Sequence, residues 1–258
     1  MVKHLLWFTT LFLVVGVWGK AANTSRPSDN QSVSPAVSNS LYFNYSKIQG
    51  NGQTFEGSCL SDDFNLPFLR SEWHTQSSNS LWTLKERPGY LRLKSQSKKR
   101  RQNFLNTTFS KLINLNHNGE AVSLIELSNS KESDETGLYL LTNEMQFIQV
   151  KTKNGNKLLE AKIGNNYYSG VQIDGDQIVL KLQVQSGRAW FEYSTDGLNF
   201  QRMGQSFSLN TINASQPGHV GLFYLNKKGN GGTIDIDWFY LSQDEMATQY
   251  TEVLNTLK

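Results

Sequence analysis

Residues 177–200 hold the pattern that most limits what this chain can fold into. Gln177 to Gln185 reads QIVLKLQVQ, with aliphatic residues at every second position, and Gly187 to Phe200 reads GRAWFEYSTDGLNF. Alternation with a period of two is typical of a strand with one buried face, and strands favour aromatic residues. Ser186-Gly187 and Asp196-Gly197 tolerate the positive φ angles of tight hairpin turns. The segment is predicted to form three antiparallel strands, which indicates an all-β domain.

The same alternation of short β-prone runs and turn signals continues over most of the chain. Pro88-Gly89, Asn154-Gly155 and Asp174-Gly175 are turn signals, and no helical periodicity lies between the runs. This spacing is typical of a sandwich or barrel, and we predict an antiparallel two-sheet β-sandwich over residues 57–241. The predicted strands are Leu60–Phe64, Leu81–Glu86, Tyr90–Leu93, Asn103–Phe109, Glu120–Leu127, Thr136–Thr142, Gln146–Thr152, Lys157–Ile163, Gln177–Gln185, Arg188–Ser194, His219–Tyr224 and Gly232–Leu241.

The N-terminal stretch is predicted to direct export. An apolar run follows Lys3, and small residues follow at Gly19 and Ala21, which predicts a signal peptide over residues 1–21. The alternative is an uncleaved membrane anchor, although the run is short of the ~20 residues that a span needs. Residues 22–56 are rich in Ser and Asn and are predicted to form an extended linker.

The C-terminal residues 242–258 follow a helical pattern. Ser242 and Glu245 form a capping box, and Met246 and Tyr250 begin a series of apolar residues at helical spacing. We expect a short amphipathic helix here. It either docks on its own domain or contacts a partner or a second copy.

Charge and cysteine content exclude several classes of protein. Loss of Lys3 and Lys20 with the signal peptide would lower the formal charge from +3 to +1, which argues against nucleic acid as the partner. After cleavage no membrane segment is expected. Cys59 is the only cysteine, so no intrachain disulfide can form and the core must supply the stability.

Six short motifs along the chain together resemble one known domain family. They are Asp62-Asp63-Phe64 with Leu69 and Trp73, Leu81–Leu93 (LWTLKERPGYLRL), Arg100-Arg101-Gln102, Phe191–Gly197 (FEYSTDG), Val220-Gly221-Leu222 and Ile234–Phe239 (IDIDWF). In this order they are similar to the C-terminal concanavalin A-like sandwich of family 43 β-xylosidases. The resemblance spans Asp62 to Leu241 and implies a concanavalin A-like jelly roll.

The resemblance also implies where catalysis would take place. In that family the sandwich follows a propeller that carries the catalytic carboxylates, and the sandwich helps to shape the catalytic pocket. Residues 22–56 leave no room for a propeller here, so none is expected. The chain departs from the family's Ala-Gly-Leu at Ala121–Leu124, and it has Ile236 where the family often has an aromatic residue.

The sequence offers no evident catalytic group. Glycoside hydrolysis needs two carboxyl groups about 5–10 Å apart across the scissile bond. Glu120 and Glu126 share a face of one predicted strand, but they would lie roughly 20 Å apart at the rise of a strand. His74, His117 and His219 occur in different predicted loops or strands and read as isolated. We therefore predict a chain without catalysis of its own.

Four aspartates are the candidates for a metal. The first and last strands of such a sandwich commonly pair, which would bring Asp62 and Asp63 near Asp235 and Asp237. Converging carboxylates suit Ca²⁺, which takes six to eight oxygen ligands. The alternative is that Asp235 and Asp237 only alternate outward to solvent. Any bound calcium would be structural.

Sugar binding requires exposed aromatic faces beside hydrogen-bonding groups. Tyr167 and Tyr168 stand in a segment predicted to be a polar loop, and Arg101, Gln102 and Tyr224 are second candidates on a concave face. Most other aromatic residues are expected in the core.

Together these features predict a secreted protein, extracellular or periplasmic, that acts as a carbohydrate-binding or accessory module on plant-type polysaccharide such as xylan. Its partner would be a polysaccharide or oligosaccharide. Two alternatives stay open: a glycoside hydrolase or a subunit of one, and an adaptor that complements a propeller enzyme supplied by another chain.

Overall fold

The structure is a computed structural model, and it describes residues 60–75, 77, 79–95, 108–209, 217–226 and 228–244. These residues form strands and one short 3-10 helix, and none of their helices is long and apolar enough to cross a membrane. In chain order the elements are β1 (His74–Thr75), η1 (Asn79–Leu81), β2 (Trp82–Thr83), β3 (Leu91–Lys94), β4 (Thr108–Ile113), β5 (Gly119–Glu126), β6 (Asp134–Leu141), β7 (Met145–Lys153), β8 (Asn156–Ile163), β9 (Asn166–Ile173), β10 (Gln177–Gln185), β11 (Arg188–Ser194), β12 (Gln201–Ser208), β13 (Gly218–Asn226) and β14 (Thr233–Gln243).

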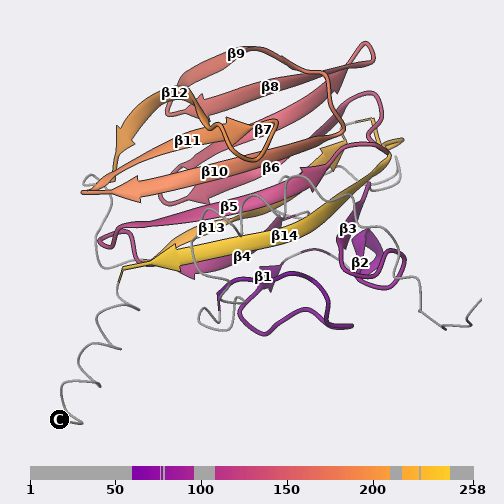
Figure 1. Cartoon of the computed structure of the whole chain (residues 1–258), viewed down its shortest axis with the longest axis horizontal. Helices are drawn as coiled ribbons and strands as arrows, with labels where there is room; N and C mark the ends of the chain where they lie inside the picture. The colour runs from indigo at the N-terminus through magenta and orange to yellow at the C-terminus, as the bar shows by residue number, and fades with distance from the viewer. Residues whose placement is uncertain are drawn as a thin grey trace, which may run out of the picture. The chain divides into compact units, whose positions relative to one another are not determined.

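The strands form two antiparallel sheets of seven strands each. Sheet I has the order β1-β4-β13-β6-β7-β8-β9, and sheet II has the order β12-β11-β10-β5-β14-β3-β2. The sheets are stacked, with β10 against β6 and β12 against β8 (Figure 1). Strands distant in sequence pair, such as β4 with β13 and β5 with β14, as expected of a jelly roll. The predicted all-β, concanavalin A-like sandwich is confirmed.

A large apolar core joins the two sheets, and a smaller buried cluster around Val122 and Trp238 lies apart from it. Leu138 and Val220 of sheet I and Leu180 and Ile236 of sheet II are fully buried members of the large core. Burying one such aliphatic side chain stabilises the fold by about 1.5–3 kcal/mol relative to leaving it exposed. The core therefore supplies the stability that a chain with one cysteine cannot take from an internal disulfide.

The hairpin of β10 and β11 forms as its sequence predicts. Val179 to Gln185 pairs in register with Ser194 to Arg188, and the two turn residues Ser186 and Gly187 have φ angles of 50° and 70°. Positive φ at both central residues gives the hairpin turn a twist that matches that of its strands.

The third strand of this meander begins later than predicted, at Gln201 rather than Leu198. The carboxylate of Asp196 accepts the backbone N–H groups of Leu198 and Asn199, each at 2.8 Å. These hydrogen bonds hold the residues after the Asp-Gly turn in a loop. They also hold the pKa of Asp196 well below its usual range, with the N–H of Asn199 the largest cause.

Several predicted strand boundaries near the N-terminal side are wrong. Leu60–Phe64 is not a strand; only Asp62 forms a bridge, to Phe239, and the positive φ of Phe64 (53°) ends the extended backbone. The predicted strand Leu81–Glu86 is reduced to β2, which follows the 3-10 helix η1.

Two further predictions of local structure are corrected. Residues 166–173, placed partly in a polar loop by the sequence, form β9 at the edge of sheet I. Ser242 is not a helix cap, because it pairs with Glu120 as part of β14. Residues 245–258 of the predicted C-terminal helix, the signal peptide, and the whole predicted linker with its boundary lie outside the described residues.

A buried polar hub fixes one end of the sandwich. Asp134, at the start of β6, accepts hydrogen bonds from the Tyr224 hydroxyl (2.8 Å), Asn226 Nδ2 (2.6 Å) and the backbone N–H of Gly232 (3.0 Å). A Cβ on Gly231 would collide with Asp134 Oδ1 and the Tyr224 hydroxyl, so this position needs glycine. Burial, followed by the charge of Asp134, raises the pKa of Tyr224 far above its usual value.

Replacing Tyr224 with Phe should destabilise the protein by about 1–2 kcal/mol, because Asp134 loses a donor while remaining buried. Urea unfolding of the purified chain measures this change. Tyr167→Phe, at an exposed position, is the matched control and should be neutral. Equal stability of the two variants would contradict the claim that the hydrogen bond between Tyr224 and Asp134 stabilises the fold.

Candidate functional site

Asp62, the first of the predicted metal ligands, holds the N-terminal segment on the sandwich. Its backbone N–H and C=O each bond to Phe239 at 2.8 Å, so the predicted pairing of the first segment with the last strand is confirmed. Its carboxylate accepts Trp73 Nε1 at 2.8 Å and the N–H of Phe64 at 2.9 Å, with Arg70 Nε at 3.7 Å. Both carboxylate oxygens therefore serve the fold.

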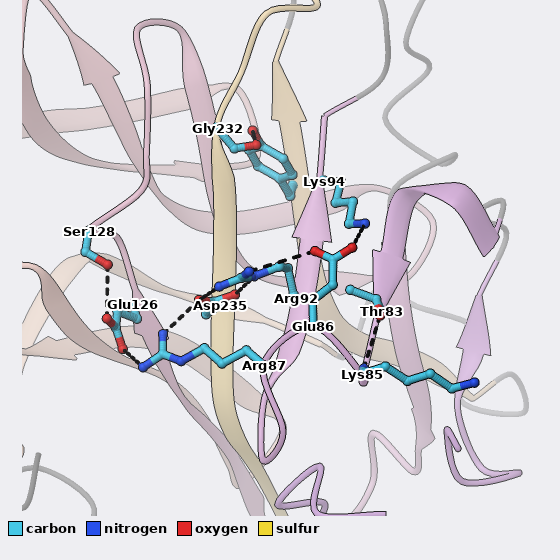
Figure 2. Close-up of polar contacts among 11 residues, drawn as sticks. Thr83, Lys85, Glu86, Arg87, Arg92, Lys94, Glu126, Ser128, Gly232 and Asp235 are labelled. Atoms are coloured by element: carbon cyan, nitrogen blue, oxygen red, sulfur yellow. Dashed lines mark hydrogen bonds and ion pairs between the residues drawn. The ribbon is translucent and has the colours of Figure 1, made fainter. Parts of the chain in front are cut away.

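Asp235, in β14, is the centre of a guanidinium–carboxylate network (Figure 2). Arg92 of β3 binds it through two hydrogen bonds of 2.7 and 2.8 Å, and Arg87 adds a third of 2.7 Å. The other Arg87 terminal nitrogen lies 2.9 Å from Glu126 of β5, which also accepts the Ser128 hydroxyl. The Arg87 guanidinium lies 3.6 Å from the centre of the Tyr90 ring.

This network decides the charge of Asp235, which is only 2% exposed. Burial alone would raise its pKa, but the hydrogen bonds and charges of Arg92 and Arg87 hold that pKa below its ordinary value. The same pairing raises the pKa of Arg87 in spite of its desolvation. Asp235 is therefore an anion matched by two cations, and its oxygens are taken by them.

Asp63 and Asp237 complete the predicted calcium set. Asp63 accepts the Asn65 side-chain amide at 2.8 Å. Burial raises the pKa of Asp237 to about 6; Arg87 opposes that shift, while Glu126 and Asp63 add to it. The acidic pairs thus share a neighbourhood, as expected. Over the described ranges, however, no group of three or more His, Cys, Asp or Glu residues could hold a metal ion. The four described aspartates therefore do not form a calcium site by themselves. Bound calcium remains a prediction.

The structure separates the residues predicted to bind sugar. Tyr167 is 68% exposed on β9, whereas Tyr168 faces inward and is packed against the core. Tyr224 is only 1% exposed, so its predicted place on an open concave face is wrong. Arg101 and Gln102 lie outside the described residues. Of the three tyrosines, only Tyr167 could meet a ligand at the surface.

Sequence reasoning missed a cleft on sheet I, with a volume of about 480 Å³. Its apolar wall consists of Trp73 and Leu141. Its polar groups come from β1, β4, β6 and β13, and they are His74, Thr75, Thr108, Ser110, Tyr139 and His219. None of these lining residues is acidic.

Two histidines from distant parts of the chain meet in this cleft. The His74 and His219 rings lie 6.0 Å apart at a near-perpendicular angle, so their predicted isolation is wrong. Strand pairing explains the contact, because His74 lies opposite Ser110 on β4, and β4 pairs with β13 next to it. The Ser110 hydroxyl lies 3.4 Å from His219 Nδ1. Burial and the charge of His74 lower the pKa of His219.

The cleft presents hydroxyl and imidazole groups beside a small apolar wall. Ser110 and His219 have the residue types of a nucleophile and its base, but such a pair needs a third group that orients the base. Among the described lining residues no carboxylate does so. Hydroxyls and imidazoles beside an apolar wall are instead what a sugar ring, with its apolar face and polar rim, requires.

Comparison with known proteins shows the family of this domain. Residues 61–242 match the family described as the β-xylosidase C-terminal concanavalin A-like domain. The chain belongs to this family. The resemblance stated from its motifs is thereby confirmed, and the domain matched is the one without the catalytic propeller.

Relatives of this β-xylosidase C-terminal domain are parts of larger proteins. A β-xylosidase of Formosa agariphila is 28% identical over 207 residues, which are 71% of this chain and 35% of that protein. A bifunctional GH43-CE protein of Bacteroides eggerthii is similar in structure, with a TM-score of 0.60 and 25% identity over 70% of this chain and 25% of its own. A GH43 protein of Bacillus licheniformis (TM-score 0.58, 20% identity, 71% and 39% covered) shares the fold.

Two neighbouring aspartates of this family member should respond oppositely to substitution by Asn. Asp235→Asn should destabilise the protein at pH 7 by about 3 kcal/mol, because two guanidiniums lose their buried counter-charge. Asp237→Asn should stabilise it, by about 2 kcal/mol or less, because ionising Asp237 is unfavourable in the fold.

The effect of Asp237→Asn on the free energy of unfolding should depend on pH. The folded pKa of Asp237, about 6, exceeds the ordinary 3.8, so its ionisation weakens the fold as pH rises between these values. The gain from Asp237→Asn should be present above pH 6 and absent below pH 4, as measured by urea unfolding at each pH. A gain that is the same at all pH values would contradict this account.

Proposed function

We propose that this chain is a non-catalytic accessory module that binds plant-type polysaccharide such as xylan. The observation that carries the proposal is that the family match covers the sandwich alone, residues 61–242, and that the matching β-xylosidase is covered over only 35% of its length. The part of this chain that resembles a β-xylosidase thus corresponds to the C-terminal domain of that enzyme.

The state of the carboxylates supports a role without catalysis. Asp235 and Glu126 are bound by Arg87 and Arg92, and Asp62 is used by backbone and indole N–H groups. Asp237, with a pKa raised to about 6, is the described carboxyl closest in character to a general acid. Its neighbour Glu126 is paired with Arg87, so it does not offer the free second carboxylate that glycoside hydrolysis requires.

The cleft of sheet I is the binding site that we assign to the sugar. Its volume, about 480 Å³, lies within the usual range for small-ligand sites. A sugar ring would lay its apolar face on Leu141, beside the edge of Trp73, and would direct its hydroxyls to His74, His219 and Ser110. Tyr167, on β9, is a second contact for a longer chain that crosses the sheet.

Export to an extracellular or periplasmic site is part of this proposal, and it rests on the apolar run after Lys3 in the first 21 residues. Such a location would bring the module to polysaccharide. A structural calcium is retained only as a prediction that chelation tests.

A second function is favoured by the size of the relatives. The chain matches about a quarter to two fifths of the length of the GH43 proteins similar to it in structure. On that basis, the second function that we propose is that of an adaptor or subunit that docks on a glycoside hydrolase chain. Co-elution of the purified chain with a GH43 propeller in size-exclusion chromatography tests this reading.

Binding to a polysaccharide panel tests the main proposal. The chain should be retained by xylan or arabinoxylan in affinity electrophoresis more strongly than by cellulose, β-glucan or fructan, and it should release no sugar from any of them. His74→Ala should weaken retention about tenfold, the loss expected of one good hydrogen bond to a ligand. His117→Ala, which changes a histidine that does not line the cleft, is the matched control and should bind nearly as the natural chain does.

The same panel run with EDTA tests the calcium prediction. Binding or stability that falls on chelation and returns with added Ca²⁺ would support a structural ion near Asp63 and Asp237. No retention by any polysaccharide would contradict the binding proposal and leave the adaptor as the better account, while release of sugar would contradict the non-catalytic role.

A further inference from the structure

The residues that line the sheet I cleft include bases but no acidic side chain. The titratable groups of this lining are His74 on β1, His219 on β13 and Tyr139 on β6. On β4, Ser110 and Thr108 present hydroxyls to the cleft. Lys111 occupies the inward-facing position between Ser110 and Leu112, and its ammonium lies 4.6 Å from the centre of the Trp73 ring, which forms part of the cleft wall. The described charges that can arise among the lining residues, apart from a tyrosinate at high pH, are positive. The Asp62 carboxylate touches the cleft wall through its hydrogen bond with Trp73 Nε1 (2.8 Å), but it does not line the cleft.

The two imidazoles are arranged so that one anion could serve both. Their ring centres are 6.0 Å apart at a near-perpendicular angle, so one anion lying beside the pair could contact a ring nitrogen of each. The Ser110 hydroxyl occupies the Nδ1 side of His219 at 3.4 Å, so the Nε2 edge is the one left for a ligand. His74 is exposed at the mouth of the cleft. Without a ligand, burial and His74 both disfavour protonation of His219.

We propose that the cleft binds a sugar that carries a carboxylate, a uronic acid residue, with that carboxylate beside the imidazoles of His74 and His219 and bound by both. The sugar ring then lies against Leu141, and its hydroxyls meet Ser110 and Thr75. This inference rests on the proposed function and deepens it, because it names the class of sugar that the module selects.

The physical reason for this selection is charge balance. Charge-assisted hydrogen bonds between an imidazolium and a carboxylate are about twice as strong as neutral ones. A carboxylate in the cleft would supply the counter-charge that the described lining lacks, and it would thereby favour the protonated form of both histidines. A neutral xylose unit offers no such compensation. The cleft should therefore prefer acidic over neutral sugar, and the more so as the pH falls toward that of histidine protonation.

Isothermal titration of the full chain with two xylo-oligosaccharides of equal length, one bearing a glucuronic acid residue, tests this inference. The acidic sugar should bind about tenfold more tightly at pH 5.5 than at pH 7.5, because binding is linked to uptake of at least one proton. Its carboxyl stays ionised over this range, since sugar carboxyls have pKa values of about 3.5 like other α-substituted acids. The neutral oligosaccharide should bind with little dependence on pH.

Two variants and a control locate the effect. His219→Gln and His74→Gln keep a polar side chain but cannot become cations, so each should reduce binding of the acidic sugar at pH 5.5 about tenfold. Each should also reduce its pH dependence. His117→Gln, which changes a histidine outside the cleft, should leave both unchanged. Thermal unfolding of each variant controls for loss of the fold.

The outcomes separate this inference from the proposed function. Equal binding of acidic and neutral oligosaccharides, without pH dependence, would overturn the uronic acid assignment and leave the binding module intact. Binding of sodium acetate as tight as that of the acidic sugar would overturn it as well, because the cleft would then be a general anion site. Failure of both oligosaccharides to bind would count against the binding module itself and against this inference.

Discussion

The ionised Asp235 carboxylate, buried in the middle of sheet II, is the constraint on which much of the structure depends. A buried charge is strongly unfavourable unless it is paired and hydrogen-bonded. Arg92 on β3 and Arg87 in the β2–β3 loop must therefore both be in place, and Arg87 in turn reaches Glu126 on β5. One carboxylate thus ties together β14, β3, β5 and the loop that carries the Arg-Pro-Gly motif. Three adjacent strands and a loop are held together by a network whose central carboxylate has both oxygens bound by arginine.

The two sheets divide structure and function between them. In sheet II the described carboxylates around Asp235 are bound by guanidiniums, which stabilises the sheet but removes the paired carboxyl groups that hydrolysis would need. In sheet I the cleft is lined by hydroxyls and imidazoles and has no carboxylate. The cleft lies within residues 61–242, which match the β-xylosidase C-terminal concanavalin A-like family.

Much of the fold could be predicted because its signals are local. The β10–β11 hairpin follows from alternation and from Ser186-Gly187, and both are read within a few residues. β9 was missed because Gly170 with φ 118° and a register shift opposite Leu159 and Glu160 break its alternation. Ser242 pairs with Glu120 in the sheet instead of capping a helix. This pairing joins residues distant in sequence, so no local pattern predicts it.

The candidate site was harder to predict than the fold, because its residues meet only through tertiary structure. His74 stands in a strand of two residues, too short to show any period, and His219 follows 145 positions later. Tyr224 was placed on the surface because adjacent aromatic residues do not reveal which one faces inward. Its partner Asp134 lies 90 positions away. By contrast, the convergence of Asp62 with Asp235 and Asp237 was predictable from the pairing of the first and last segments, but the arginines that occupy Asp235 were not.

The most direct test of this account is to observe the histidine side chains by NMR while an oligosaccharide of xylan is added to the ¹⁵N-labelled chain. The account predicts that the ring nitrogen signals of His74 and His219 shift together and saturate at the same ligand concentration, while those of His117 stay in place. Saturable shifts confined to other surfaces, with both cleft histidines unmoved, would contradict the central claim that the cleft of sheet I is the sugar-binding site.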